Sequence, residues 1–269
     1  MSEGFQLDAE GKITAATSFL MIHHALRRDA VRFPHALAAL NPHDAEQAQR
    51  LAGHWKLYHW ALADHSENED DSLFPLVTSR AGELAPVMVE LEKDHADLDR
   101  ELEEITRQME RLPEADAIEA ARAATERLHT HLERHLALEE KHIVPVLVDR
   151  VRPEEIAGGQ GGGGRGQSGG PGGGPQGPGG GPQGPGGGPQ GPGGAQDGDG
   201  GAYRPPTWLV SAWTDEGLDR AVTEAVLAAL PPKFQQQMGA ALVGWRTDYH
   251  RLVAEVWRDV PADLAPEAP

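Results

Sequence analysis

Two His-x-x-x-Glu pairs stand out in the sequence, because imidazole and carboxylate groups both bind metal ions. The segment from His65 to Val77 reads HSENEDDSLFPLV, and the segment from His135 to Leu147 reads HLALEEKHIVPVL. Residues four apart on a helix share one face, so each pair can direct both groups at one point. One pair would arise easily among 13 histidines. Two pairs that each end in two acidic residues, an aliphatic residue and proline predict a two-metal site.

Two further histidines lie on apolar helix faces and extend the candidate site. His23 shares a face with Phe19, Leu26 and Phe33, which favours it over the neighbouring His24. Burying six ionisable groups without compensation would be very costly, and a pair of metal ions supplies that compensation. With no thiolate, the donors suit iron, manganese or zinc, and iron is favoured if the chemistry is redox. The predicted metal ligands are His23, His65, Glu69, His95, His135 and Glu139.

Four helical segments are needed to position these ligands. Apolar residues three or four apart predict helices over about 14–40, 44–80, 83–111 and 114–151, with Asp44 as an N-cap. The short connections favour an all-α, up-down-up-down antiparallel four-helix bundle. At about 1.5 Å per residue, the six ligands lie roughly 14–24 Å from a common end of this bundle, so they can meet in one layer. Pro75 and Pro145 occupy matched positions, which suggests an internal duplication.

The rest of the chain divides into a linker and a tail. Of the 33 glycines, 26 lie in 158–201, where a Gly/Pro/Gln repeat of period seven predicts a flexible tether. We therefore predict a bundle over 1–157, a disordered linker over 158–202 and a C-terminal helical extension over 203–269.

The extension is expected to form a helical hairpin. One helix is predicted to start at Thr214 and lead to Leu230, and a second to run from about Phe234 to Trp257. Four of the six tryptophans lie in this extension. They suit docking on the bundle, on another copy of the chain or on a protein partner.

Composition limits the classes of partner. The formal net charge is −18, whereas nucleic-acid and anionic-membrane binders need clustered Lys and Arg. Cysteine is absent, which excludes disulfides and thiolate sites. The polar N-terminus and the short apolar run from Phe19 to Ile22 lack the features of a signal peptide or a membrane span. We expect a cytoplasmic protein that binds neither nucleic acid nor membrane.

The motifs resemble those of the hemerythrin HHE cation-binding domain family, as found in bacterial hemerythrin-like proteins, over about residues 14 to 151. The resemblance rests on His23 with the following ALRRD, on both His-x-x-x-Glu segments with their prolines, and on His95. It implies a non-haem centre of two iron ions that binds dioxygen, nitric oxide or peroxide. Oxygen-carrying members place two ligand histidines four apart on the third helix.

Here Leu91 and Asp99 lie four residues on either side of His95. One metal position is therefore expected to lack a histidine, and water, Asp99, His131 or His142 could fill it.

Three functions remain open on this basis. The first is uptake of a small diatomic ligand for storage, delivery or sensing. The second is a di-iron enzyme, such as an oxidase, a peroxidase-like or catalase-like enzyme, or a protein that handles nitric oxide. The third is an iron-responsive module whose tail binds a protein partner.

Overall fold

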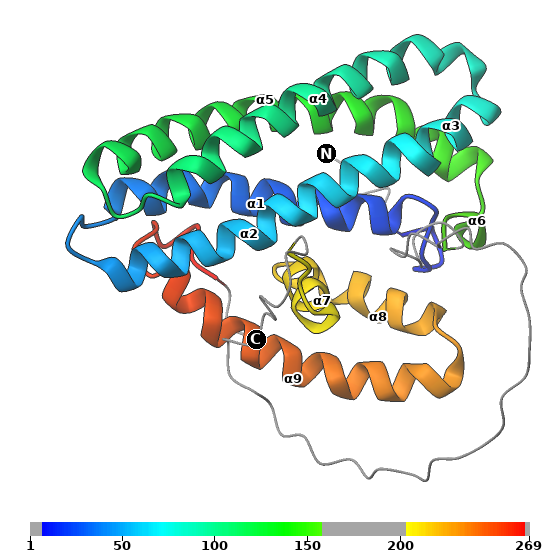
Figure 1. Cartoon of the computed structure of the whole chain (residues 1–269). Coiled ribbons are helices and arrows are strands. Elements are labelled where there is room, and N and C mark those ends of the chain that lie inside the picture. Colours follow the sequence, from blue (N-terminus) through cyan, green and yellow to red (C-terminus); the bar gives the residue numbers. More distant parts are fainter. Residues whose placement is uncertain (1–6, 158–202, 267–269) are drawn as a thin grey trace, which may run out of the picture.

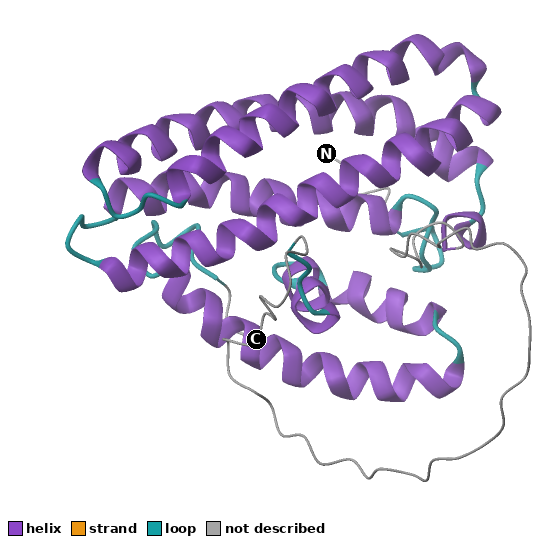
Figure 2. Ribbon diagram, in the orientation of Figure 1, coloured by secondary structure: helices purple, strands orange, loops and turns teal. Residues whose placement is uncertain are grey.

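The chain is all-helical over the residues that the computed structural model describes, 7–157 and 203–266 (Figures 1 and 2). This confirms the predicted all-α class. Within residues 7–157 the four long helices are α1 (Thr17–Ala39), α2 (Ala45–Asn68), α4 (Ala85–Met109) and α5 (Ala115–Arg150). The shorter elements are η2 (Glu69–Leu73), α3 (Phe74–Arg80), η3 (Gly82–Leu84) and α6 (Pro153–Ala157). The predicted linker, 158–202, lies outside the described residues.

The four long helices of residues 7–157 pack side by side into a helical bundle. Helix α1 contacts α5 and α2, and α4 contacts the same two helices from the other side (Figure 1). Asp44 caps α2 as predicted, since its carboxylate accepts a hydrogen bond from the Gln47 N–H at 2.9 Å. No helix among the described residues combines the length and apolar character that crossing a membrane requires.

Two apolar clusters fill the bundle and leave a polar layer between them. One cluster includes Leu26, Leu98 and Leu132, and the other includes Phe19 and Leu91. On α1 and α4 the predicted ligands lie between members of the two clusters along the helix. The clusters therefore enclose the ligand layer from both ends.

The predicted helix over 44–80 is interrupted by a wider turn. Segment η2 is π-helical, and the Phe74 N–H donates to the Glu69 carbonyl five residues earlier. Pro75 follows and has no N–H to donate, which removes one α-helical hydrogen bond at this point. Single π-turns of this kind are frequent at functional sites. Here the π-turn carries Glu69.

The tail forms α7 (Thr207–Asp215), α8 (Arg220–Ala229) and α9 (Pro232–Val256). The prediction that a helix starts at Thr214 is wrong: Thr214 lies in the last turn of α7 and is followed by Gly217 with φ +73°. Helix α8 instead begins after Asp219, whose carboxylate accepts from the Ala221 N–H. The second predicted helix, Phe234 to Trp257, corresponds to α9.

The tail packs on the bundle, with α7 against α1 and α9 against α2 (Figure 1). Trp213 and Trp257 are buried in the same apolar cluster as Leu26 and Leu98. The sequence left three docking surfaces open for these tryptophans. In the structure Trp213 and Trp257 dock on the bundle.

A buried polar cluster holds α7 against the bundle. The Asp29 carboxylate accepts from the His54 Nε2 at 2.8 Å and from the Trp213 Nε1 at 2.7 Å. Arg28 donates through Nη1 to the carbonyls of Trp213 and Glu216. Arg32 Nη1 lies 2.9 Å from the Glu216 carboxylate and 3.2 Å from the Asp29 carboxylate. Two cations and two carboxylates thus balance one another in this cluster, which limits the cost of burying them.

Candidate metal centre

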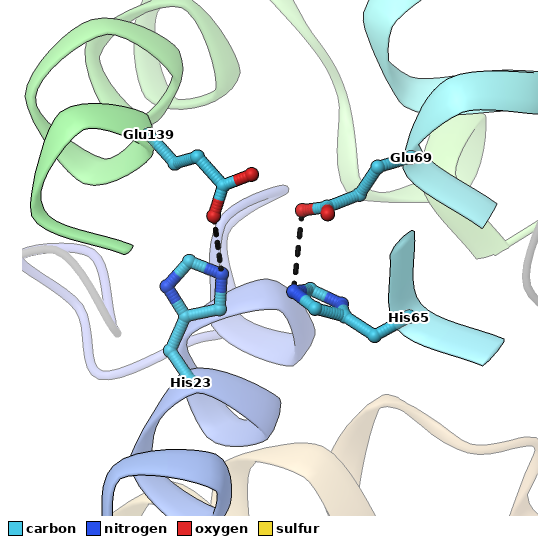
Figure 3. Close-up of side chains that lie close together, drawn as sticks. All are labelled: His23, His65, Glu69 and Glu139. Carbon is cyan, nitrogen blue, oxygen red and sulfur yellow. Dashed lines mark ion pairs between the residues drawn. The ribbon is translucent and has the colours of Figure 1, made fainter. Parts of the chain in front are cut away.

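All six predicted ligands meet in the polar layer of the bundle. Figure 3 shows His23 of α1 directed at Glu139 of α5, and His65 of α2 directed at Glu69 of η2. His95 of α4 and His135 of α5 approach the same two carboxylates from the other side. All of these side chains are buried except that of His65, which is mostly buried.

The six residues form two overlapping groups of donors. One group is His23, His65, Glu69 and Glu139, and the other is Glu69, His95, His135 and Glu139. Within each group, one ligand atom from every residue lies within 4.8 Å of the others. Glu69 and Glu139 belong to both groups. Each carboxylate has two oxygens, so the pair can serve two ions at once.

The spacing of the donor atoms fits metal coordination better than direct hydrogen bonding. His23 Nε2 lies 3.4 Å from a Glu139 oxygen, and His65 Nε2 lies 3.3 Å from a Glu69 oxygen. Neither pair forms a hydrogen bond, and both carboxylates are buried without a hydrogen-bond partner. Metal–ligand bonds of about 2.0–2.2 Å would separate adjacent donors on one ion by roughly 3.0–3.4 Å.

The second group repeats this spacing. The His135 Nε2 lies 3.1 Å from a Glu139 oxygen and 3.2 Å from the His95 Nε2. Buried polar atoms that lack partners are rare in folded proteins. The residues therefore fit a metal pair at this site.

Carboxylates behind the histidines orient the imidazole rings. The Asp70 oxygen accepts from His95 Nδ1 at 2.9 Å, and the Glu140 oxygen accepts from His23 Nδ1 at 3.0 Å. An ionised carboxylate only accepts, so each of these Nδ1 atoms carries a proton and each Nε2 faces the site. Asp94 lies 3.7 Å from the Nδ1 of His135.

Sequence reasoning did not assign these three acids. Each, however, is the immediate neighbour of a predicted ligand, and that adjacency is the signal in the sequence.

Burial and mutual charge shift the pKa values of the ligands in opposite directions. Burial, reinforced by the Glu139 carboxylate, raises the pKa of Glu69 well above its usual range. Burial and the nearby His23 lower the pKa of His65 well below its usual range. Burial also lowers the pKa of His95, but the carboxylates of Glu139 and Glu69 outweigh it and raise the value to about 10. Such opposed shifts are typical of functional sites.

The other residues considered for the site lie elsewhere. His24, the alternative to His23, points its Nε2 at the Glu216 carbonyl of the tail, 3.3 Å away. Asp99 is exposed, and neither it nor His142 belongs to either donor group. His131 donates to Glu101 on α4. Each group thus holds two histidines without a contribution from these three candidates.

Tyr58 lies seven residues before His65 on α2, and its hydroxyl donates to the Leu26 carbonyl at 3.3 Å. The Leu26 carbonyl is a backbone group in the apolar cluster. The Tyr58 hydroxyl therefore bonds to none of the predicted ligands.

Comparison with known proteins agrees with the donor geometry. Residues 14–147 match the family model described as the hemerythrin HHE cation binding domain. Residues 14–147 belong to that family. The match spans all six predicted ligands, so the hemerythrin domain of this chain is a metal-binding domain whose His/Glu cluster is assembled in the structure. No curated protein and no solved structure matches the chain.

Proposed function

We propose that the hemerythrin domain is a cytoplasmic, antiparallel up-down-up-down four-helix bundle that holds two iron ions and binds dioxygen or a related small ligand. The observation that carries this proposal is the pair of overlapping donor groups, in which Glu69 and Glu139 are common to both. His23 and His65 would hold one ion, and His95 and His135 the other. Bound iron would supply redox chemistry with dioxygen, nitric oxide or peroxide.

The protein's own contribution is orientation and exclusion of water. Asp70 and Glu140 hold two of the imidazole rings with Nε2 toward the site. The apolar clusters on either side keep solvent from the layer. Electrostatic interactions are stronger in a layer from which water is excluded, because the effective dielectric constant there is low.

The test is metal analysis combined with an optical spectrum. We expect the full-length protein to bind two iron ions per chain and its visible absorption to change when air replaces nitrogen. The variant Glu139→Gln, which keeps the shape but removes a charge shared by both groups, should bind one ion or none. Glu126→Gln, at an exposed position of the same helix, is the matched control and should bind two. Equal iron binding by both variants, or an unchanged spectrum in air, would contradict the proposal.

A second candidate function is a di-iron enzyme that consumes peroxide or nitric oxide. The observation favouring it is that each group contains only four protein residues, two histidines and two shared carboxylates. Iron commonly takes more ligands than this, so positions remain for a reacting molecule. Turnover of peroxide or nitric oxide by the iron-loaded wild type, abolished in Glu69→Gln, would favour the enzyme over the carrier. Stable binding without turnover would exclude it.

A further inference from the structure

A small cavity lies beside one half of the candidate metal centre. Its volume is about 80 Å³, and its wall includes the side chains of His65 and Glu69. The rest of the lining is mainly apolar and includes Ile22 of α1, Leu76 of α3 and Ile156 of α6. The cavity therefore joins two metal-ligand candidates to a helix that follows the bundle.

Helix α6 forms one wall of this cavity and is fastened by ion pairs. It lies at the end of the bundle where α3 is found (Figure 1). Its Glu155 carboxylate accepts from Arg80 of α3 at 2.5 Å and from the Arg152 backbone N–H at 3.0 Å. Ile156, the next residue, packs against the apolar cluster that contains Phe74 and Ile143. These contacts hold Ile156 in the wall of the cavity.

The volume restricts what the cavity can hold. A water molecule needs about 10–15 Å³ of such cavity volume, so the space suits a molecule of no more than about six heavy atoms. Pockets for organic ligands are on the order of 300–1,000 Å³. Dioxygen, nitric oxide and hydrogen peroxide fit by size, whereas organic peroxides with bulky groups do not.

We propose that Ile156 is the residue that determines the size of molecules able to reach His65 and Glu69. The identity of the molecules rests on the proposed function, but the size limit rests on the cavity. Ile22 lies on a helix that carries a predicted ligand, and Leu76 lies on α3, directly after the π-turn that carries Glu69. Ile156 lies on a helix without any of the six ligands. A substitution at Ile156 can therefore change the size of the cavity with little effect on the positions of the six predicted ligands.

The first experiment measures the cavity without iron. Xenon binding to the metal-free full-length protein is followed by xenon NMR, because xenon enters small apolar cavities. We expect wild type to bind xenon, Ile156→Trp to lose binding, and Ile156→Ala to retain it. Glu154→Ala, an exposed position on the same helix, is the control and should match wild type. Unchanged xenon binding in Ile156→Trp would overturn the proposal.

The second experiment measures passage to the iron-loaded centre. Nitric oxide association is followed by stopped-flow absorbance, with nitrosobenzene as a bulky probe of the same chemistry. Ile156→Trp should lower the rate of nitric oxide association by on the order of tenfold or more, since the larger side chain overfills the cavity. Ile156→Ala should bind nitrosobenzene, which wild type and Glu154→Ala should exclude. Iron content should be equal in all four proteins.

The two experiments separate failure of this inference from failure of the proposed function. If iron-loaded wild type binds no nitric oxide, the proposed function fails, and the xenon result still tests the cavity. If Ile156→Trp loses xenon but binds nitric oxide at the wild-type rate, ligands reach the centre by another route and the inference is wrong. Nitrosobenzene binding to wild type would contradict it as well.

Discussion

At the scale of single residues, the donor set depends on carboxylates that do not themselves face the centre. Asp70, Asp94 and Glu140 each follow or precede a predicted ligand in the sequence, yet each lies behind a histidine from a different helix. The ligand and its neighbour thus serve different helices. This arrangement ties the orientation of the imidazoles to the packing of the bundle.

Asp70→Asn should weaken metal binding while leaving the ligands in place. The amide can still contact His95 Nδ1, but it no longer favours the tautomer that presents Nε2 to the site. We expect affinity for iron to fall by about 10–100-fold, the usual effect of losing such a partner. Competition with a chelator of known affinity measures the change. Asp71→Asn alters the exposed neighbour and should leave affinity unchanged; an equal loss in both variants would show a general charge effect instead.

The meeting of six His and Glu side chains could be predicted from the sequence, because spacing and apolar faces determine which side chains point inward. The same reasoning selected His23 over His24, and the structure directs His23 at Glu139 and His24 at the tail. The acids behind the histidines could not be assigned. Adjacent residues on a helix point about 100° apart, so their partners depend on how neighbouring helices are rotated.

At the scale of elements, the two halves of the bundle differ despite their matched motifs. Pro75 follows the π-turn η2, whereas Pro145 lies inside the continuous helix α5. A proline removes one hydrogen bond, but the surrounding packing decides whether the backbone widens or continues. The sequence therefore predicted helix at both places and could not distinguish the two outcomes. Helix α7 could not be predicted for a different reason. Thr214-Asp215-Glu216 has residue types that are common at the start of a helix, whereas in the structure these residues end α7.

Gly217→Ala should destabilise the turn that follows α7. Gly217 has φ +73°, and a Cβ placed there would lie 3.2 Å from the His24 Nε2. We expect the free energy of unfolding to fall by about 1–2 kcal/mol, the cost of a left-handed conformation for a residue with a side chain. Denaturant unfolding followed by tryptophan fluorescence measures it.

Gly239→Ala is the matched control for Gly217→Ala. Gly239 lies inside α9, and a Cβ there would meet nothing within 4 Å. Alanine should raise stability by roughly 0.5–1 kcal/mol, because it favours the helix. If Gly217→Ala does not lower the free energy of unfolding relative to Gly239→Ala, the turn is not constrained as the structure indicates.

At the scale of the whole molecule, the tail and the bundle share one apolar cluster and one buried polar cluster. Asp29 links the two parts, since its carboxylate contacts both α2 and α7. Burial raises the pKa of Asp29, but Arg28, His54 and Arg32 outweigh burial and hold it well below its usual value of 3.8. The folded protein therefore binds fewer protons at this group than the unfolded chain does.

Stability of the metal-free protein should consequently fall as the pH drops below about 4. A carboxyl group whose pKa is lowered by folding stabilises the folded state at pH values above its pKa in the unfolded chain. This contribution is lost as the pH falls below that unfolded pKa towards the folded one. Asp29→Asn should be less stable at pH 6 and lose less stability between pH 5 and pH 3. Denaturant unfolding across this range measures both slopes. Asp248→Asn, an exposed position of α9, should keep the wild-type slope; an unchanged slope in Asp29→Asn would contradict the assignment.

The adjacency of His23 and His24 connects the metal centre to the tail through a single stretch of α1. His23 faces Glu139, while the next side chain lies against Glu216 and Gly217. If metal binding alters tail docking by some factor, thermodynamic reciprocity requires docking to alter metal affinity by the same factor. A partner that captured the released tail would then act as an effector of metal affinity without contacting any ligand residue.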